Sequence, residues 1–130
     1  MEWCIHWKNE LVKHQLMGTG TTGSKVAEET GLDVEILHSG PFGGDQQIGA
    51  KICEQKLDIL IFFWDPLASM AHDQDVKALF RIASLYNVIM ATNQSTANLI
   101  MSNAKIGEII KIPRPHMQKY MKRNIHEAQE

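Results

Sequence analysis

The chain has 130 residues, 44% of them hydrophobic, and a formal net charge of −2 at pH 7. This length suits one domain with one sizeable core, so we expect a single domain over residues 1–130. The nearly neutral charge provides no field to draw the protein onto nucleic acid or an anionic membrane, so small molecules and proteins are the expected partners.

Cysteines and apolar runs bear on the compartment. Cys4 and Cys53 belong to no Cys-x-x-Cys pair, so neither a disulfide framework nor a zinc site is indicated. The most apolar run, Leu57–Trp64, is too short to cross a bilayer, and the N-terminus carries no charged-then-apolar leader. We therefore expect a cytoplasmic protein.

The first half of the chain alternates between helical and extended patterns. Apolar residues recur at helical spacing from Trp3 to Val12, which predicts an amphipathic helix that begins almost at the first residue. A short apolar stretch at Leu16-Met17 then runs into a glycine- and threonine-rich loop. The residues 24–30 fit a short helix closed by Gly31, and Val34–Leu37 fits a strand.

The second half repeats this alternation. A nearly continuous apolar run at Leu57–Phe63 predicts a central parallel strand covered by helices on both faces. The other expected elements are helices over Gln47–Gln55 and through Val76–Leu85, a strand at Val88–Ala91, a helix opened by residues 92–95 with Ser95 as its cap, a last strand within Ile106–Ile112, and a helical tail over residues 113–130.

Repeated strand, polar loop and helix imply right-handed crossovers and a mostly parallel sheet, hence a three-layer α/β/α fold with Rossmann-type layering. Ligands of such folds bind beyond the carboxyl ends of the strands. The polar loops at residues 18–23, 39–46, 64–75 and 92–95 all follow predicted strands. We therefore expect these loops to converge on one side of the sheet.

The first of these loops, Gly18–Gly23, has the composition of a phosphate site. Its backbone N–H groups, the hydroxyls of Thr19, Thr21 and Thr22, and the positive end of the next helix can all bind an anion. A glycine-rich turn with capping threonines explains the same residues equally well. The spacing also matches G-x-G-x-x-G, but no acidic residue is clearly placed to bind a ribose, so a dinucleotide site is the weakest alternative.

In the second loop Asp45 follows two glycines, which allow backbone and carboxylate to approach a small substrate closely. Asp45 can serve there as a general base. It can also simply cap the helix that starts near Gln46, and the local pattern favours this second role.

The third loop places Asp65, His72, Asp73 and Asp75 after the most apolar strand, a density of groups able to move protons. His72 could polarise a carbonyl group. A metal site would need converging ligands, and the run from His72 to Asp75 is more simply explained as a helix start with acidic residues at the positive dipole end.

Several motifs in a fixed order resemble the methylglyoxal synthase family from the first helix to about Ser102. They are Gly18-Thr19-Gly20-Thr21-Thr22-Gly23, Ser39-Gly40-Pro41-Phe42-Gly43-Gly44-Asp45-Gln46-Gln47, Phe62-Phe63-Trp64-Asp65-Pro66-Leu67, His72-Asp73-Gln74-Asp75-Val76-Lys77-Ala78-Leu79 and Ala91-Thr92-Asn93.

The resemblance implies a lyase that converts dihydroxyacetone phosphate to methylglyoxal and inorganic phosphate, with phosphate also a candidate inhibitor. It implies no cofactor, no metal and a homohexamer. By matching position, Asp45 is the base that removes the proton, His72 hydrogen-bonds the substrate oxygens, and Asp65 and Asp75 orient the site. The residues that would bind phosphate are Thr19, Gly20, Thr21, Thr22, Ser39 and Gly40.

One departure from the family pattern concerns the start. The family begins with an apolar strand that ends in an Ala-His-Asp motif and is followed by a phosphate-binding lysine, and it places that strand in the middle of the sheet. The present chain starts in the helix that follows, as an N-terminally truncated member would. If Met1 is the true start, we expect low or absent synthase activity and poor stability.

Two further functions remain open on these residues. The same fold can serve as an effector-binding regulatory module, which needs no base. A catalytically impaired subunit that assembles with an intact synthase is the other alternative, because the start of the family pattern is missing.

Overall fold

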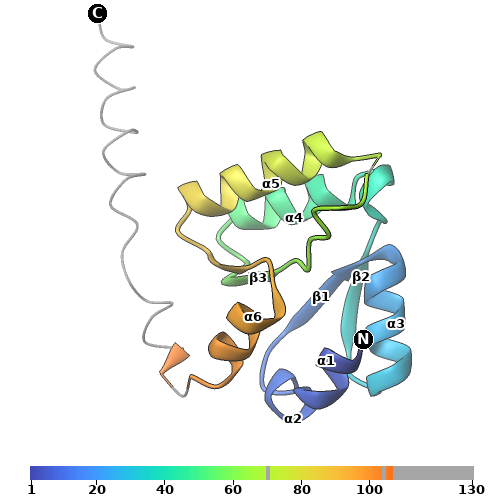
Figure 1. Cartoon of the computed structure of the whole chain (residues 1–130), viewed down its shortest axis with the longest axis vertical. Coiled ribbons are helices and arrows are strands. Elements are labelled where there is room, and N and C mark those ends of the chain that lie inside the picture. The colour runs from blue at the N-terminus through green and yellow to red at the C-terminus, as the bar shows by residue number, and fades with distance from the viewer. Residues whose placement is uncertain (70, 104, 107–130) are drawn as a thin grey trace, which may run out of the picture.

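Strands and helices alternate through the computed structural model, which describes residues 1–69, 71–103 and 105–106 (Figure 1). The elements are α1 (Glu2–His6), α2 (Lys8–Leu11), β1 (Leu16–Thr19), α3 (Gly20–Thr30), β2 (Val34–Leu37), the 3₁₀ turn η1 (Gly40–Phe42), α4 (Gly44–Cys53), β3 (Ile59–Ile61), α5 (Asp73–Leu85), β4 (Ile89–Ala91) and α6 (Gln94–Met101).

The strands form two parallel pairs. β1 pairs with β2, in a register that sets Leu16 opposite Val34, and β3 pairs with β4, in a register that sets Ile59 opposite Ile89. Within the described residues no pairing joins one pair to the other. The expected parallel strands are therefore present, but the sheet consists of two separate halves.

Two apolar clusters cover the two faces of these strands. One cluster is built on α4 and α5 and contains Ile48, Ile52 and Leu79 together with side chains of all four strands. The other is built on α1, α2 and α6 and contains Trp3, Leu11 and Ile100, again with side chains of both strand pairs. The strands therefore lie between a layer of α4 and α5 and a layer of α1, α2 and α6. This arrangement confirms the expected three-layer α/β/α fold.

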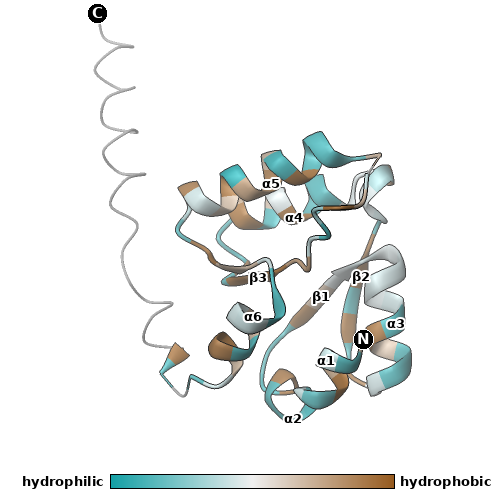
Figure 2. Cartoon of the chain, viewed as in Figure 1, coloured by the Kyte–Doolittle hydropathy of each residue, from teal (hydrophilic) through white to brown (hydrophobic). Residues whose placement is uncertain are grey.

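The hydropathy of the strands and helices agrees with this three-layer arrangement. Figure 2 shows strands that are largely hydrophobic, while α3 and α5 carry both hydrophilic and hydrophobic residues. The α5 helix buries Val76, Leu79 and Ala83, which recur at helical spacing, and leaves Lys77 and Arg81 exposed. An amphipathic helix of this kind buries one side against the strands and leaves the other in water.

Two element boundaries differ from the expected ones for identifiable reasons. The α3 helix begins at Gly20 rather than at residue 24, because glycines let β1 turn directly into the helix: a Cβ on Gly23 would lie 2.7 Å from the Gly18 carbonyl oxygen. The regular part of β3 is shorter than the expected run, since its partner β4 ends at Ala91. Beyond it, the N–H groups of Phe62 and Trp64 donate to the carbonyl oxygens of Ala91, which ends β4, and of Thr92, which follows it.

One helix cap differs from the expected residue, and another agrees with it. Asn93, not Ser95, caps α6, and its side chain accepts a hydrogen bond from the backbone N–H of Thr96 at 2.9 Å. Asn93 has extended backbone angles, as a cap requires, whereas Ser95 already lies inside the helix. Gly31 closes α3 with a φ of 72°, as predicted. The expected strand within Ile106–Ile112 and the tail over 113–130 fall almost wholly outside the described residues.

Candidate active site

Three of the four polar loops meet at the carboxyl ends of the strands. The backbone N–H of Gly20, at the end of β1, donates to the His38 carbonyl oxygen at the end of β2. A Cβ on Gly40 would lie 2.5 Å from Cε1 of the His72 ring, so the second loop packs directly on the third. The fourth loop adjoins the start of the third, because Trp64 N–H donates to the Thr92 carbonyl oxygen.

Asp45 and His72 form the central contact of this region. The two residues are 27 positions apart in the sequence, and Nδ1 of His72 lies 2.6 Å from Oδ2 of Asp45. The Asp45 side chain is 3% exposed and that of His72 is 17% exposed. A buried carboxylate therefore has a single histidine partner, and the histidine ring still reaches solvent.

The start of α4 excludes one of the two expected roles of Asp45. The α4 helix begins at Gly44, with Gly43 as its N-cap and no side-chain cap. Asp45 lies inside the first turn, so the helix-cap interpretation is wrong. Its carboxylate instead points to His72 at the positive end of α4, where the partial charges of free N–H groups stabilise an anion.

Two glycines before Asp45 allow the start of α4 to pack closely on the ends of β1 and β2. Gly43 has a φ of 101°, a conformation that disfavours side chains. A Cβ on Gly44 would lie 2.0 Å from the His38 carbonyl oxygen and 2.9 Å from the Thr19 methyl carbon. The first turn of α4 is therefore pressed against the ends of β1 and β2, which brings Asp45 beside the first loop.

The expected phosphate-binding residues gather at the start of α3. Thr21 and Thr22 are exposed in the first turn of this 11-residue helix, and Thr19 is half-buried before it. A Cβ on Gly20 would lie 2.7 Å from Cβ of Ser39, so the two predicted anion loops are in contact. N–H groups in the first turn of a helix have no intrahelical partner, which leaves donors for an anion here.

The two remaining predicted acids, Asp65 and Asp75, have different surroundings. Asp65 is exposed, and its Oδ1 accepts a hydrogen bond from Leu67 N–H at 3.0 Å, which shapes the third loop. Asp75 is half-buried in the first turn of α5 and lines a groove of about 200 Å³ between α4 and α5. Asp45 lines the same groove as Asp75, whereas neither His72 nor Asp65 is among the residues that line it.

Sequence inspection did not single out Gln47 or Arg81. The Gln47 Oε1 accepts a hydrogen bond from His38 N–H at 2.7 Å, which ties the second loop back onto α4. Arg81 lines the groove that contains Asp45 and Asp75. The polar run after Asp45 was a signal for Gln47, whereas nothing local to Arg81 indicates the groove.

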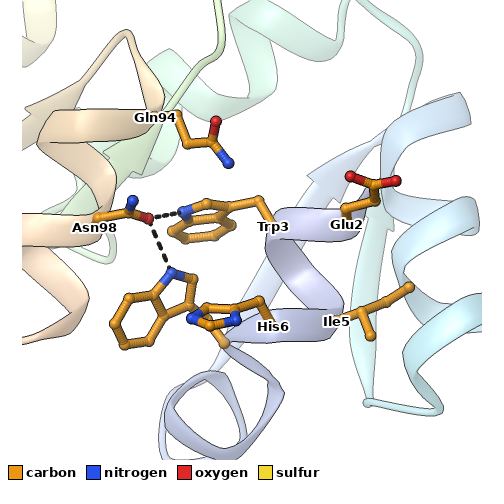
Figure 3. Close-up of a pocket in the computed structure, with 7 residues that line it drawn as sticks. Glu2, Trp3, Ile5, His6, Gln94 and Asn98 are labelled. Carbon is orange, nitrogen blue, oxygen red and sulfur yellow. Dashed lines mark hydrogen bonds between the residues drawn. The ribbon is translucent and has the colours of Figure 1, made fainter.

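A larger cavity than this groove lies elsewhere. It measures about 590 Å³ between α1 and α6, and none of the predicted site residues lines it (Figure 3). Both of its indole N–H groups, on Trp3 and Trp7, donate to Oδ1 of Asn98, at 2.8 and 3.0 Å. These donors are already satisfied, so we place the candidate site at Asp45 and His72, where the strand ends and the loops meet.

Two kinds of feature are absent from the described residues. No group of three or more His, Cys, Asp or Glu residues is placed to hold a metal ion in that part of the chain. Among the same residues, no helix is long and apolar enough to span a bilayer.

The chain is similar to known proteins along most of its length. The family model for the MGS-like domain matches residues 3–92. Methylglyoxal synthase of Proteus mirabilis (strain HI4320) is 49% identical over 125 residues, which cover 96% of this chain and 82% of that protein. The methylglyoxal synthase of Yersinia enterocolitica is 46% identical over the same coverage.

A solved structure shows the same fold. The crystal structure of methylglyoxal synthase from Elizabethkingia anophelis NUHP1 is similar at a TM-score of 0.76 and 43% identity, over 81% of this chain and 69% of that one. With its fold, its ordered loops and these relatives, the chain belongs to the methylglyoxal synthase family.

Proposed function

We propose that the protein converts dihydroxyacetone phosphate to methylglyoxal and inorganic phosphate, with Asp45 as the catalytic base. The buried contact of 2.6 Å between Asp45 and His72, beside two glycine-rich loops, is the observation that carries this proposal. Removal of a proton next to a carbonyl group requires a base and a second group that stabilises the developing oxyanion. Asp45 would be the base, and His72 would stabilise the oxyanion.

The substrate phosphate would lie against the first turn of α3. Thr19, Thr21 and Thr22 offer hydroxyls there, and Ser39 and Gly40 bring a second loop into contact with Gly20. The helix dipole favours an anion at this end. Holding the phosphate here would set the carbon skeleton toward Asp45, since the start of α4 packs on the same strand ends.

The reaction needs one proton transfer and one bond cleavage. The Asp45 carboxylate takes a proton from the carbon that carries the hydroxyl group, and the electron pair moves to the carbonyl oxygen to give an enediolate. The hydroxyl oxygen of the enediolate then forms a new carbonyl, the double bond shifts towards the phosphate-bearing carbon, and phosphate leaves with the electron pair of the broken C–O bond and the hydroxyl proton. The resulting enolate takes the proton held by Asp45 onto its terminal carbon, which gives methylglyoxal. The same enediolate could instead return as an isomerised triose phosphate. This isomerisation is avoided only if the phosphate is held in a geometry that favours its departure.

The His72 ring restricts how this site can operate. When Asp45 is ionised, it must accept a hydrogen bond from Nδ1–H of His72. A neutral ring then has a bare Nε2, which cannot donate to a substrate oxygen. His72 can therefore stabilise an oxyanion only as an imidazolium, or after the substrate has separated it from Asp45.

Asp65 and Asp75 are proposed as supporting groups. Asp75 shares a groove with Asp45 and can assist proton movement there. Asp65 shapes the third loop through its bond to Leu67 N–H and so affects how that loop closes on the site.

Several broader properties are proposed on the resemblance to the family. They are a single domain over residues 1–130, a homohexamer, a cytoplasmic location, and a reaction without metal or cofactor whose phosphate product can also inhibit. Binding of an anionic effector without turnover is the second candidate function, because the touching loops of Gly20 and Ser39 need no base to hold an anion.

Formation of methylglyoxal from dihydroxyacetone phosphate, followed by trapping of the dicarbonyl product, tests the main proposal. The protein should release one phosphate for each methylglyoxal, and Asp45→Asn should bind phosphate but lose turnover. Saturable binding of the substrate or of a nucleotide with no product from the unaltered protein would favour the second candidate.

A further inference from the structure

The backbone of His38 is bonded to both parts of the candidate site. His38 lies directly after β2, at the start of the second loop. Its carbonyl oxygen accepts a hydrogen bond at 3.3 Å from the N–H of Gly20, which begins α3. Its own N–H donates to Oε1 of Gln47 on α4 at 2.7 Å. One residue therefore connects the two anion loops to the helix that carries Asp45.

The bond from Gln47 starts on a rigid element. The α4 helix is anchored in the core by Ile48 and Ile52, both of which are buried. Gln47 directly precedes Ile48 and is itself half-buried. Side chains on a packed helix hold their partners more precisely than side chains on a loop do. The Gln47 bond therefore fixes the second loop relative to α4.

Only the oxygen of the Gln47 side chain can make this bond. A backbone N–H is a donor, so the amide group must present its carbonyl oxygen rather than its NH₂ group. The bond spans nine residues and so closes the segment that contains Asp45. Inside this segment the Ser39 carbonyl oxygen accepts a bond from Gly44 N–H at 3.0 Å. The Gln47 bond therefore closes the outer end of the second loop, and the Ser39 bond closes its inner part.

We propose that Gln47 is a positioning residue for the reaction, a role that rests on the proposed synthase function. Gln47 acts through the backbone of His38 rather than by touching the substrate. The first and second loops stay joined through Gly20 when the Gln47 bond is lost, so they still bind an anion. The position of that anion relative to Asp45 changes instead, and a displacement of about 1 Å can lower a rate about 10²-fold.

A second contact of the same helix supplies a matched control. Lys51 lies one turn after Gln47 on α4, and its Nζ is 3.3 Å from Oε1 of Glu35 on β2. Both contacts therefore join α4 to the β2 segment. The Lys51 contact is with a mostly exposed carboxylate before the second loop, and exposed ion pairs of this kind contribute little. Lys51→Met removes it and leaves the His38 bond in place.

Steady-state kinetics with dihydroxyacetone phosphate and calorimetry with inorganic phosphate test the role. Gln47→Met removes the acceptor at nearly constant size, so kcat should fall at least about tenfold while phosphate affinity stays within about twofold. Gln47→Glu keeps an acceptor oxygen and should hold kcat within about threefold, although its negative charge should raise KM for an anionic substrate. Lys51→Met should change neither quantity by more than about twofold.

Amide hydrogen exchange, followed by NMR, reports on the bond itself without any need for turnover. The His38 amide should exchange at least about tenfold faster in Gln47→Met, and at its original rate in Gln47→Glu and Lys51→Met. His38 is exposed and Gln47 is half-buried, so the loss of this one bond should not unfold the protein.

The outcomes separate this role from the proposed function. An unchanged kcat or an unchanged His38 exchange rate in Gln47→Met would overturn the role alone. Equal losses of kcat in Gln47→Met and Gln47→Glu would also overturn it, because the acceptor would then not matter. Absence of turnover in the unaltered protein would overturn the proposed function and this role with it.

Discussion

At the residue scale, the pair of Asp45 and His72 carries the proposed chemistry. Asp45→Asn should lower kcat by about 10²–10⁴-fold, because an amide cannot accept the proton. The side chain keeps nearly the same shape, so phosphate affinity should stay within about twofold. Steady-state kinetics and phosphate binding by calorimetry measure the two quantities. Turnover close to that of the unaltered protein would remove Asp45 as the base.

The Gly40–His72 contact allows a second test of the same pair. A Cβ on Gly40 would lie 2.5 Å from the His72 ring, so Gly40→Ala should displace the ring from Asp45 and lower kcat at least about tenfold. Gly49→Ala is the matched control, since nothing lies within 4 Å of a Cβ there. Equal kinetics of the two variants would show that the ring position does not matter.

The proposed role of Asp45 as the base follows from the sequence only through the resemblance to a family. Its local surroundings, two glycines and then a helix, are those of a cap. The contact that contradicts the cap comes from His72, which is 27 residues away and on another element. The residues next to Asp45 in the sequence do not indicate such a distant partner. The ordered motifs do associate Asp45 with His72, because both belong to the pattern of one family.

At the scale of the element, the first turn of α4 packs on the ends of β1 and β2, and this packing fixes the position of Asp45. Gly44→Ala should destabilise the protein strongly, because its Cβ would lie 2.0 Å from a backbone oxygen that cannot move freely. Gly49→Ala on the same helix should instead stabilise it by about 0.5–1 kcal/mol, since alanine has the higher helix propensity. Urea unfolding of both variants gives the comparison, and destabilisation by both to the same extent would contradict it.

Element types were predictable, and their ends less so. Helices and strands follow apolar periodicity, which each segment carries in itself. The start of α3 at Gly20 depends on the close approach of Gly18 and Gly23, and the cap of α6 depends on the backbone angles of Asn93. These boundaries are set by backbone geometry rather than by side-chain pattern.

At the scale of the whole molecule, the division of the sheet could not be derived from local patterns, because pairing joins strands that are far apart in sequence. Both strand pairs nevertheless contribute to both apolar clusters. Packing should therefore couple the two halves into one cooperative unit, even though no backbone bond joins them in the described part of the chain.

The two cysteines can report on this coupling. Cys4 packs on the cluster of α1, α2 and α6, and burial raises the pKa of its thiol above the ordinary value. A raised pKa lowers the thiolate fraction at neutral pH, so Cys4 should react slowly and gain reactivity only at higher pH. Cys53 is exposed and should react first with a thiol reagent, which makes it the internal reference in each sample.

Ile52→Ala then tests whether the halves unfold together. Ile52 is 0% exposed in the cluster of α4 and α5, so its truncation should cost about 2–5 kcal/mol. If the molecule is one cooperative unit, the same loss should speed labelling of Cys4, on the opposite face, by at least about tenfold. Mass spectrometry of timed labelling measures both thiols. A lower melting temperature with unchanged Cys4 labelling would mean that the two faces unfold independently, because the cost would then stay on the side of α4 and α5.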